Sequence, residues 1–214
     1  MIGAIKTGKY SRKNWIEKER NFDVFDIKND ALRILNEIGI DSSKIVVSNK
    51  TKKWYHPGRS GLLSLGSNGP ELAYFGEIHP SIIKKLDLKT ENILGFEIFL
   101  DNVPESRKKI REVKPQFAFS DYQKVVRDFA FVIDEKYSSG EIINFVKKID
   151  KGLIKNVKIF DVYQGENITS GKKSIAFSVT LEPKDKTLSE KDIEEVSKKI
   201  ISAVQETTGA TLRS

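Results

Sequence analysis

The sequence of 214 residues contains no cysteine, one methionine and two histidines. Without cysteine, disulfides and thiolate chemistry are excluded, which fits a reducing compartment. No run of about 18 apolar residues occurs, and the opening MIGAIKTGKY is too short and too polar for a signal peptide. We therefore expect a soluble, cytoplasmic protein that has no membrane partner.

Motifs for catalysis and metal binding are also missing. The sequence shows no Ser/His/Asp grouping, and HPGRSG lacks the GxxxxGK[ST] arrangement that cradles a triphosphate. His56 and His79 each precede a proline, which favours turn formers at strand-to-helix junctions over metal ligands, even though Glu77 is near. Asp23 and Asp26 bracket a Val-Phe pair; a catalytic carboxylate pair is one interpretation of them, and strand-end caps are the favoured one. The sequence therefore predicts no catalytic residue and no metal site.

Charge of both signs is abundant, with 37 Lys and Arg against 30 Asp and Glu, for a formal net charge of +7. This balance favours an anionic partner, although mild basicity is also common in proteins that bind nothing anionic. The hydrophobic fraction of 38% allows one large or two modest domains.

The second half of the chain has the pattern of a βαββαβ unit. Ser138 with Glu141, and Ser189 ahead of a long apolar stripe, mark two helix starts, and Gly209 marks a helix end. With right-handed crossovers this order gives a four-stranded antiparallel sheet with both helices on one face and the first and third strands adjacent. The strands are expected at residues 127–134, 156–163, 173–181 and 210–213.

The third of these strands has an unusual second face. Its large residues alternate with a set that is uniformly small, Ser174, Ala176 and Ser178. The large set faces the helices, so the small set lies on the open face beside Ala130 of the first strand. The sequence predicts a flat, uncovered sheet surface.

The first half is expected to be mixed α+β, with a helix at 27–38 stopped by Gly39 and a shorter helix at 81–86. Its first strand has no evident partner, so we expect this module to be truncated. The charged stretch ESRKKIREVKPQF is typical of a linker. The resulting domains are 1–113, a linker at 114–119, and 120–214. The strands of the first half are expected at residues 2–6, 45–48, 61–65, 73–78 and 95–100.

Several motifs resemble one known family in its own order. VVRDFAFVID, FDVYQG, GKKSIAFSVTL, TLSEKDI and GATLR are similar to the anticodon-binding domain that closes the bacterial phenylalanyl-tRNA synthetase β subunit. Upstream, FDVFDIKNDALRIL, YHPGRSG and FGEIHPSIIKKLDL resemble the preceding module of that subunit, a catalytically silent relative of the class II synthetase core. The resemblance implies a truncated class II synthetase-like module followed by a ferredoxin-like βαββαβ domain.

The resemblance also implies a function. The sheet face would bind the anticodon stem-loop of tRNA-Phe, while the α subunit of an α2β2 enzyme attaches phenylalanine with ATP and Mg2+. No cofactor is expected in this chain, which alone is expected to be inactive. In the family, positions matching Ala130, Tyr163 and Ser174 meet anticodon bases. The full set of expected RNA-binding residues is Ala130, Tyr163, Ser174, Ala176, Ser178, Lys172, Lys173 and Arg127.

The sequence leaves three points open. The family often has Phe-Pro-Ala-Val-Arg-Arg-Asp ahead of the first strand, whereas this chain has YQKVVRD. Val126 replaces the first arginine, and Lys124 is expected to restore part of its charge. The face of the sheet that Tyr163 takes is also undetermined. The alternative function is a protein-interaction module that docks partner subunits with little RNA contact.

Overall fold

A computed structural model describes residues 1–90, 92–104 and 120–213 of the chain. The chain divides into two compact units, Met1–Glu112 and Val113–Ser214. The linker predicted at residues 114–119 lies outside the described residues.

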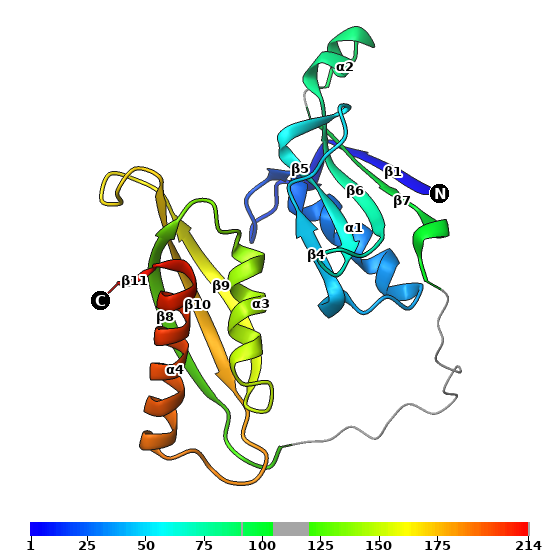
Figure 1. Cartoon of the computed structure of the whole chain (residues 1–214). Helices are drawn as coiled ribbons and strands as arrows, with labels where there is room; N and C mark the ends of the chain where they lie inside the picture. The colour runs from blue at the N-terminus through cyan, green and yellow to red at the C-terminus, as the bar shows by residue number, and fades with distance from the viewer. Residues whose placement is uncertain (91, 105–119, 214) are drawn as a thin grey trace. The chain divides into compact units, whose positions relative to one another are not determined.

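The first unit is built on a five-stranded antiparallel sheet with the order β1-β7-β6-β5-β4. Helix α1 packs on one face of this sheet, against β6 and β7 (Figure 1). A separate two-stranded hairpin, β2 with β3, precedes α1. The elements are β1 (Ile2–Thr7), β2 (Lys9–Ser11), β3 (Arg20–Asn21), α1 (Val24–Glu37), η1 (Ser42–Lys44), β4 (Ile45–Ser48), β5 (Tyr55–Leu65), β6 (Glu71–Ile78), α2 (Pro80–Lys85), β7 (Ile93–Ile98) and η2 (Leu100–Asn102).

Helix α1 begins earlier than the sequence pattern indicated. Asp23 is its N-cap and accepts from the backbone of Phe25 at 2.8 Å, while the Asp26 carboxylate accepts from the backbone of Asp23 at 2.9 Å. This reciprocal pair is a capping box, which satisfies two otherwise unpaired backbone donors. The interpretation of these two aspartates as strand-end caps was therefore wrong. The stripe of Ile27, Ala31 and Leu35 is fully buried against the sheet.

Two further expectations for the first unit are corrected. Strand β1 does have a partner, since it pairs antiparallel with β7 from Ile2↔Ile98 to Thr7↔Ile93. His56 and its proline lie inside β5, where an irregular register toward β6 follows Tyr55, rather than in a turn. The prediction for His79 is confirmed, because it caps α2 directly after β6 and its Nδ1 accepts from the backbone of Ser81.

The second unit has the predicted βαββαβ order and is antiparallel throughout, with the strand order β11-β8-β10-β9. Figure 1 shows both helices on the same side of the sheet. The elements are β8 (Val125–Asp134), α3 (Ser139–Ile149), β9 (Ile154–Tyr163), β10 (Lys172–Leu181), α4 (Glu190–Thr208) and β11 (Thr211–Leu212).

The core of this unit lies between the sheet and the two helices. Phe129, Phe131 and Phe177 meet on the two central strands with ring centroids 5.8–6.5 Å apart. Each large residue of β10 is buried, as the alternation predicted. The predicted capping box of Ser138 and Glu141 is present, and Ser189 caps α4 as predicted, in a second capping box with Asp192. Gly209 ends α4 in the left-handed conformation with a φ of 65°. Local sequence signals therefore fix the starts of both helices and the end of α4.

Candidate nucleic-acid interface

The open face of the second unit's sheet is set by cross-strand register, because directly paired residues point to the same side. Ala176 pairs with Ala130 on one side and with Asp161 on the other. Ser174 is likewise flanked by Val132 and Tyr163. We call this surface the open face; its members on the three long strands are Val126, Asp128, Ala130, Val132, Asp134, Lys172, Ser174, Ala176, Ser178, Thr180, Asn156, Lys158, Asp161 and Tyr163.

A β-bulge brings Tyr163 to this face. Between the pairs Ala176↔Asp161 and Phe177↔Ile159, the register shifts and Phe160 is left without a partner. Simple alternation from Ile159 would group Tyr163 with that core-facing residue. The extra residue breaks this parity, as bulges do, so Tyr163 shares the open face with Asp161 and Ser174. Its side chain is 39% exposed.

Gly165 holds the Tyr163 ring close to the strand end. A Cβ placed on Gly165 would lie 2.3 Å from the Tyr163 hydroxyl oxygen and 2.6 Å from Cζ. The ring therefore packs directly over the backbone of the following loop, which also has a hydrogen bond from the Ile168 amide to the Gly165 carbonyl at 2.9 Å. Only a residue without a side chain leaves room for this ring position.

Ser174 is less open than the sequence suggested, since it is only 4% exposed. The Arg213 guanidinium, which comes from the far edge of the sheet, donates from Nη1 to Ser174 Oγ at 3.4 Å. Its backbone amide donates to the Ala130 carbonyl at 2.8 Å. Arg213 therefore reaches across β8 and covers part of the surface expected to be bare.

The sequence reading missed Arg213 because its place depends on the short strand β11. Thr211 pairs with Val132 on β8, which aligns the end of the chain with the open face. The turn before β11 is fixed by Thr208, whose hydroxyl accepts from the backbone of Ala210 at 3.2 Å. The motif GATLR was a signal for the strand, but not for the reach of its arginine.

The open face is electrically balanced. Its cations are Lys158, Lys172 and Arg213, and its carboxylates are Asp128, Asp134 and Asp161. Any binding by this face must then depend on contacts with neutral groups as much as on the attraction of a polyanion.

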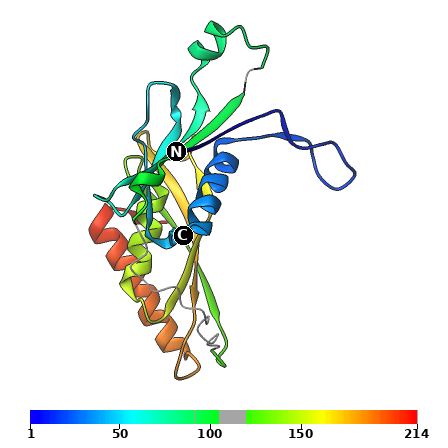
Figure 2. The same cartoon turned by 90° about the vertical axis from the view of Figure 1, so that its right-hand side faces the viewer.

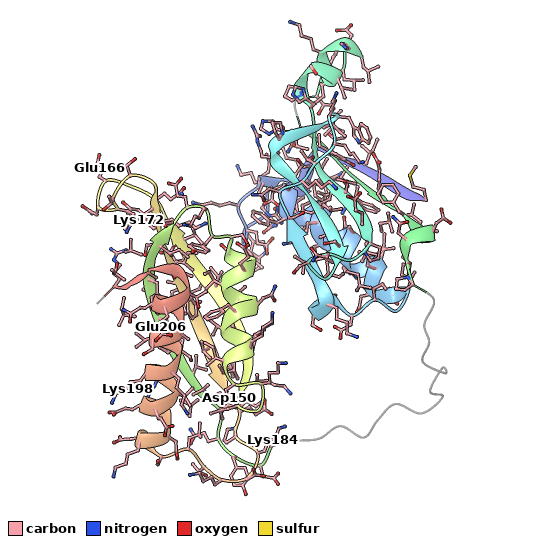
Figure 3. The ribbon with its side chains drawn as sticks, viewed as in Figure 1. Asp150, Glu166, Lys172, Lys184, Lys198 and Glu206 are labelled. Atoms are coloured by element: carbon pink, nitrogen blue, oxygen red, sulfur yellow. The ribbon has the colours of Figure 1, made fainter. Side chains whose placement is uncertain are left out.

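Two of the predicted positions, Arg127 and Lys173, lie off the open face. Arg127 lies on the opposite side of β8 from the open face, the side that faces the helices. There it lines a shallow hollow beside α4 with Glu190 and Glu194. Lys173 lies on the same side of β10 as the buried core residues. Its Nζ donates to the carbonyl of Glu135 at 3.2 Å. Lys172, at the start of β10, belongs to the open face and lies at the loop end of the sheet (Figure 3).

Lys124 was expected to replace the charge of a missing arginine. Its Nζ lies 3.3 Å from the carboxylate of Glu182, whose side chain is largely buried. Because the Lys124–Glu182 pair has no net charge, Lys124 adds little attraction for a phosphate.

Two carboxylates of the first unit accept hydrogen bonds from aromatic side chains. The Trp54 indole donates to Glu97 at 2.9 Å, and the Tyr74 hydroxyl donates to Glu71 at 2.9 Å. Burial, followed by the hydrogen bond to Glu71, raises the pKa of Tyr74 to about 12. Tyr74 thus stays protonated at neutral pH and acts as a structural donor.

Nowhere in residues 1–90, 92–104 and 120–213 do three or more His, Cys, Asp or Glu side chains gather as metal ligands. None of the described helices is both long and apolar enough to span a bilayer.

Comparison with known proteins matches both units. Residues 120–213 fit the family model described as a ferredoxin-fold anticodon binding domain. Residues 1–100 fit that described as the phenylalanyl tRNA synthetase beta chain CLM domain. The phenylalanine–tRNA ligase beta subunit of Rhodospirillum rubrum is 41% identical over 214 residues, which are 100% of this chain and 26% of that protein. The chain belongs to the phenylalanine–tRNA ligase beta-subunit family.

Other members of the beta-subunit family are similarly related. That of Paramagnetospirillum magneticum is 41% identical over 213 residues, with 100% of this chain and 26% of the relative covered. That of Bartonella henselae is 42% identical over 199 residues, with 93% and 24% covered. The chain thus spans about a quarter of the length of these beta subunits.

Proposed function

We propose that this chain binds the anticodon stem-loop of tRNA-Phe through the open face of its second unit. The observation that carries the proposal is the platform formed by Ala130, Ala176 and Ser174, with the Tyr163 ring at one edge and the Arg213 guanidinium reaching in from the other. Recognition of specific RNA sequences usually targets unpaired loop bases, which stack on aromatic rings or guanidinium planes. The match to an anticodon-binding family model supports the same assignment.

The small side chains of the platform let a flat base approach the sheet closely. Tyr163 then offers a ring for stacking, an interaction worth about 1–3 kcal/mol per base. Asp161 on β9 supplies an acceptor for the N–H groups of a base edge, and the Arg213 guanidinium, held beside Ser174, supplies donors. The open face thus combines stacking, close approach and hydrogen bonding, which are the means by which single-stranded RNA is read.

The balanced charge of the open face supports recognition of the bases more than electrostatic binding to the phosphates. With three cations and three carboxylates, few phosphates would be neutralised, so we expect a shallow salt dependence. Each phosphate contact on a single strand lowers log K by about 0.7 for each tenfold increase in salt. Specificity for the anticodon sequence should therefore persist at salt concentrations that abolish general binding.

The remaining roles rest on the family. The proposed domains are a catalytically silent class II synthetase-like module at 1–113, a linker at 114–119 and the anticodon-binding domain at 120–214. The α subunit would attach phenylalanine to the tRNA, and this chain would hold the tRNA in place. ATP and Mg2+ would serve that whole enzyme. The described residues of this chain offer no cluster that fits a metal ion.

The test is a titration of this chain with an isolated anticodon stem-loop of tRNA-Phe and with a loop of scrambled anticodon. We expect the cognate loop to bind more tightly. Tyr163→Ala should weaken cognate binding by about 1–3 kcal/mol, whereas Val162→Ala, on the opposite face of β9, should leave it unchanged. Equal affinity for both loops would refute the proposal and favour a protein-docking module.

A further inference from the structure

The second surface of interest is the hairpin formed by β2, β3 and the loop between them, residues 9–21, which we call the β2–β3 hairpin. At its tip Trp15 is 93% exposed and the adjacent Ile16 is 72% exposed. Figure 2 shows this hairpin extending away from the sheet of its own unit. Two large neighbouring apolar side chains in water mark an interaction site more than a scattered surface residue does.

The tip is held in one conformation. The side-chain oxygen of Asn14 accepts from the backbone of Ile16 at 2.8 Å and of Glu17 at 2.7 Å. Across the loop, the Ser11 hydroxyl donates to the carbonyl of Lys18 at 3.3 Å. The two apolar side chains are thus presented on an ordered turn, which reduces the entropy lost when they dock.

The base of the hairpin is fixed to the body of the unit. The Arg20 guanidinium lies 3.7 Å from the centre of the Tyr10 ring and donates twice to Asp26 of α1, at 2.6 and 2.8 Å. Tyr10 in turn meets Phe22 edge-to-face, with centroids 5.5 Å apart. These contacts attach the base of the hairpin to helix α1 and so set the direction in which the hairpin projects.

The chemistry of the tip favours a protein over a nucleic acid. Trp15 has a ring on which a base could stack, but the adjacent Ile16 is aliphatic and gains most from burial in an apolar pocket, and the carboxylate of Glu17 would repel a phosphate beside it. Tryptophan, by contrast, is the residue most enriched among the anchors of protein interfaces. Among residues 1–90, Arg12, Lys13 and Lys18 form no ion pair. These three cations outnumber the carboxylate of Glu17, so the tip has a net positive charge.

We propose that the β2–β3 hairpin inserts Trp15 and Ile16 into an apolar pocket with an acidic rim on the companion subunit of the enzyme. The inference rests on the proposed membership of a two-subunit enzyme, since the relatives are named beta subunits. It is independent of the open face, which lies in the other unit.

Affinity gives the first test. The alpha subunit of the same organism is titrated with this chain and its variants. Trp15→Ala should raise the Kd about 25-fold or more, the range of an interface anchor, and Trp15→Phe should retain most of the affinity. Leu86→Ala removes an apolar side chain that is 63% exposed at the end of α2 and is the matched control. An unchanged Kd for Trp15→Ala, or no complex with the unmodified chain, would overturn the inference.

Cysteine labelling gives the second test, because the chain has no cysteine of its own. In Ile16→Cys the thiol should react freely in the isolated chain and at least about tenfold more slowly in the complex. Ser67→Cys, in the turn between β5 and β6, should react equally in both. Protection by tRNA alone would identify a nucleic acid as the occupant and overturn the inference, as would full reactivity in the complex.

The two proposals fail separately. Trp15→Ala should bind the anticodon stem-loop like the unmodified chain, so a loss of subunit binding with normal RNA binding supports the hairpin alone. Conversely, hairpin protection in a chain that does not distinguish the cognate loop would leave the inference intact and refute the proposed RNA function.

Discussion

The position of the Tyr163 ring can be perturbed without changing Tyr163 itself. In Gly165→Ala, the new methyl group would lie 2.3 Å from the tyrosine hydroxyl and 2.6 Å from Cζ. Such separations are far below van der Waals contact, so the ring must move. Because the loop is exposed, the free energy of unfolding should change by no more than about 0.5 kcal/mol.

The expected effect is on RNA binding. If the displaced ring no longer stacks on a base, cognate stem-loop affinity should fall by about 1–3 kcal/mol, which is about 5- to 150-fold in Kd. The matched control is Gly140→Ala in α3, where an added Cβ meets nothing within 4 Å. Both variants are titrated with the cognate stem-loop, and folding is checked by thermal melting.

A double-mutant cycle makes the test sharper. In a Tyr163→Ala background the ring is already gone, so Gly165→Ala should have no further effect on affinity. Additive losses from the two substitutions would mean that Gly165 acts on RNA by another route. Full affinity in Gly165→Ala alone would refute the reasoning that ring position matters.

The other predictions concern stability. Phe177→Ala should lower the free energy of unfolding by about 3–5 kcal/mol, measured by denaturant titration, because the ring is fully buried in the aromatic core. Gly76→Ala should destabilise the first unit by about 1–3 kcal/mol from crowding, because a Cβ would lie 2.6 Å from Ser60 Cα. Backbone strain should add a similar amount, because the φ of Gly76 is 154°. A melting temperature equal to that of the unmodified chain would contradict this. Hydrogen bonds from Ser189, backbone first and hydroxyl second, lower the pKa of Asp192 from 3.8 to about 2. Asp192 therefore stabilises α4 above pH 3.8 and loses this effect as the pH falls to about 2, so the melting-temperature difference between Asp192→Ala and the unmodified chain should vanish over that range and persist near neutral pH.

The fold of the second unit could be predicted because its signals are local. The alternation on β10, the capping boxes at Ser138 and Ser189, and Gly209 after α4 each act within a few residues. In the first unit the signals are weaker. The β2–β3 hairpin has no alternating pattern, and the His56–Pro57 pair resembles a turn although β5 continues through it.

The candidate site was less predictable because it depends on register. One extra residue on β9 decides the face of Tyr163, and alternation alone does not reveal it. The role of Arg213 requires β11 to pair with β8, a contact between opposite ends of the unit. Arg127 was grouped with the open face from the family pattern, yet it alternates to the helix side of β8.

The order β11-β8-β10-β9 has a consequence for synthesis. A ribosome releases β8 first, but the two strands that flank it are the third and the last of the unit to be made. Until they emerge, the nascent chain carries a strand rich in phenylalanine with both hydrogen-bonding edges bare, the kind of template on which chains aggregate. Efficient production of this unit should therefore depend on chaperones that shield β8 during translation.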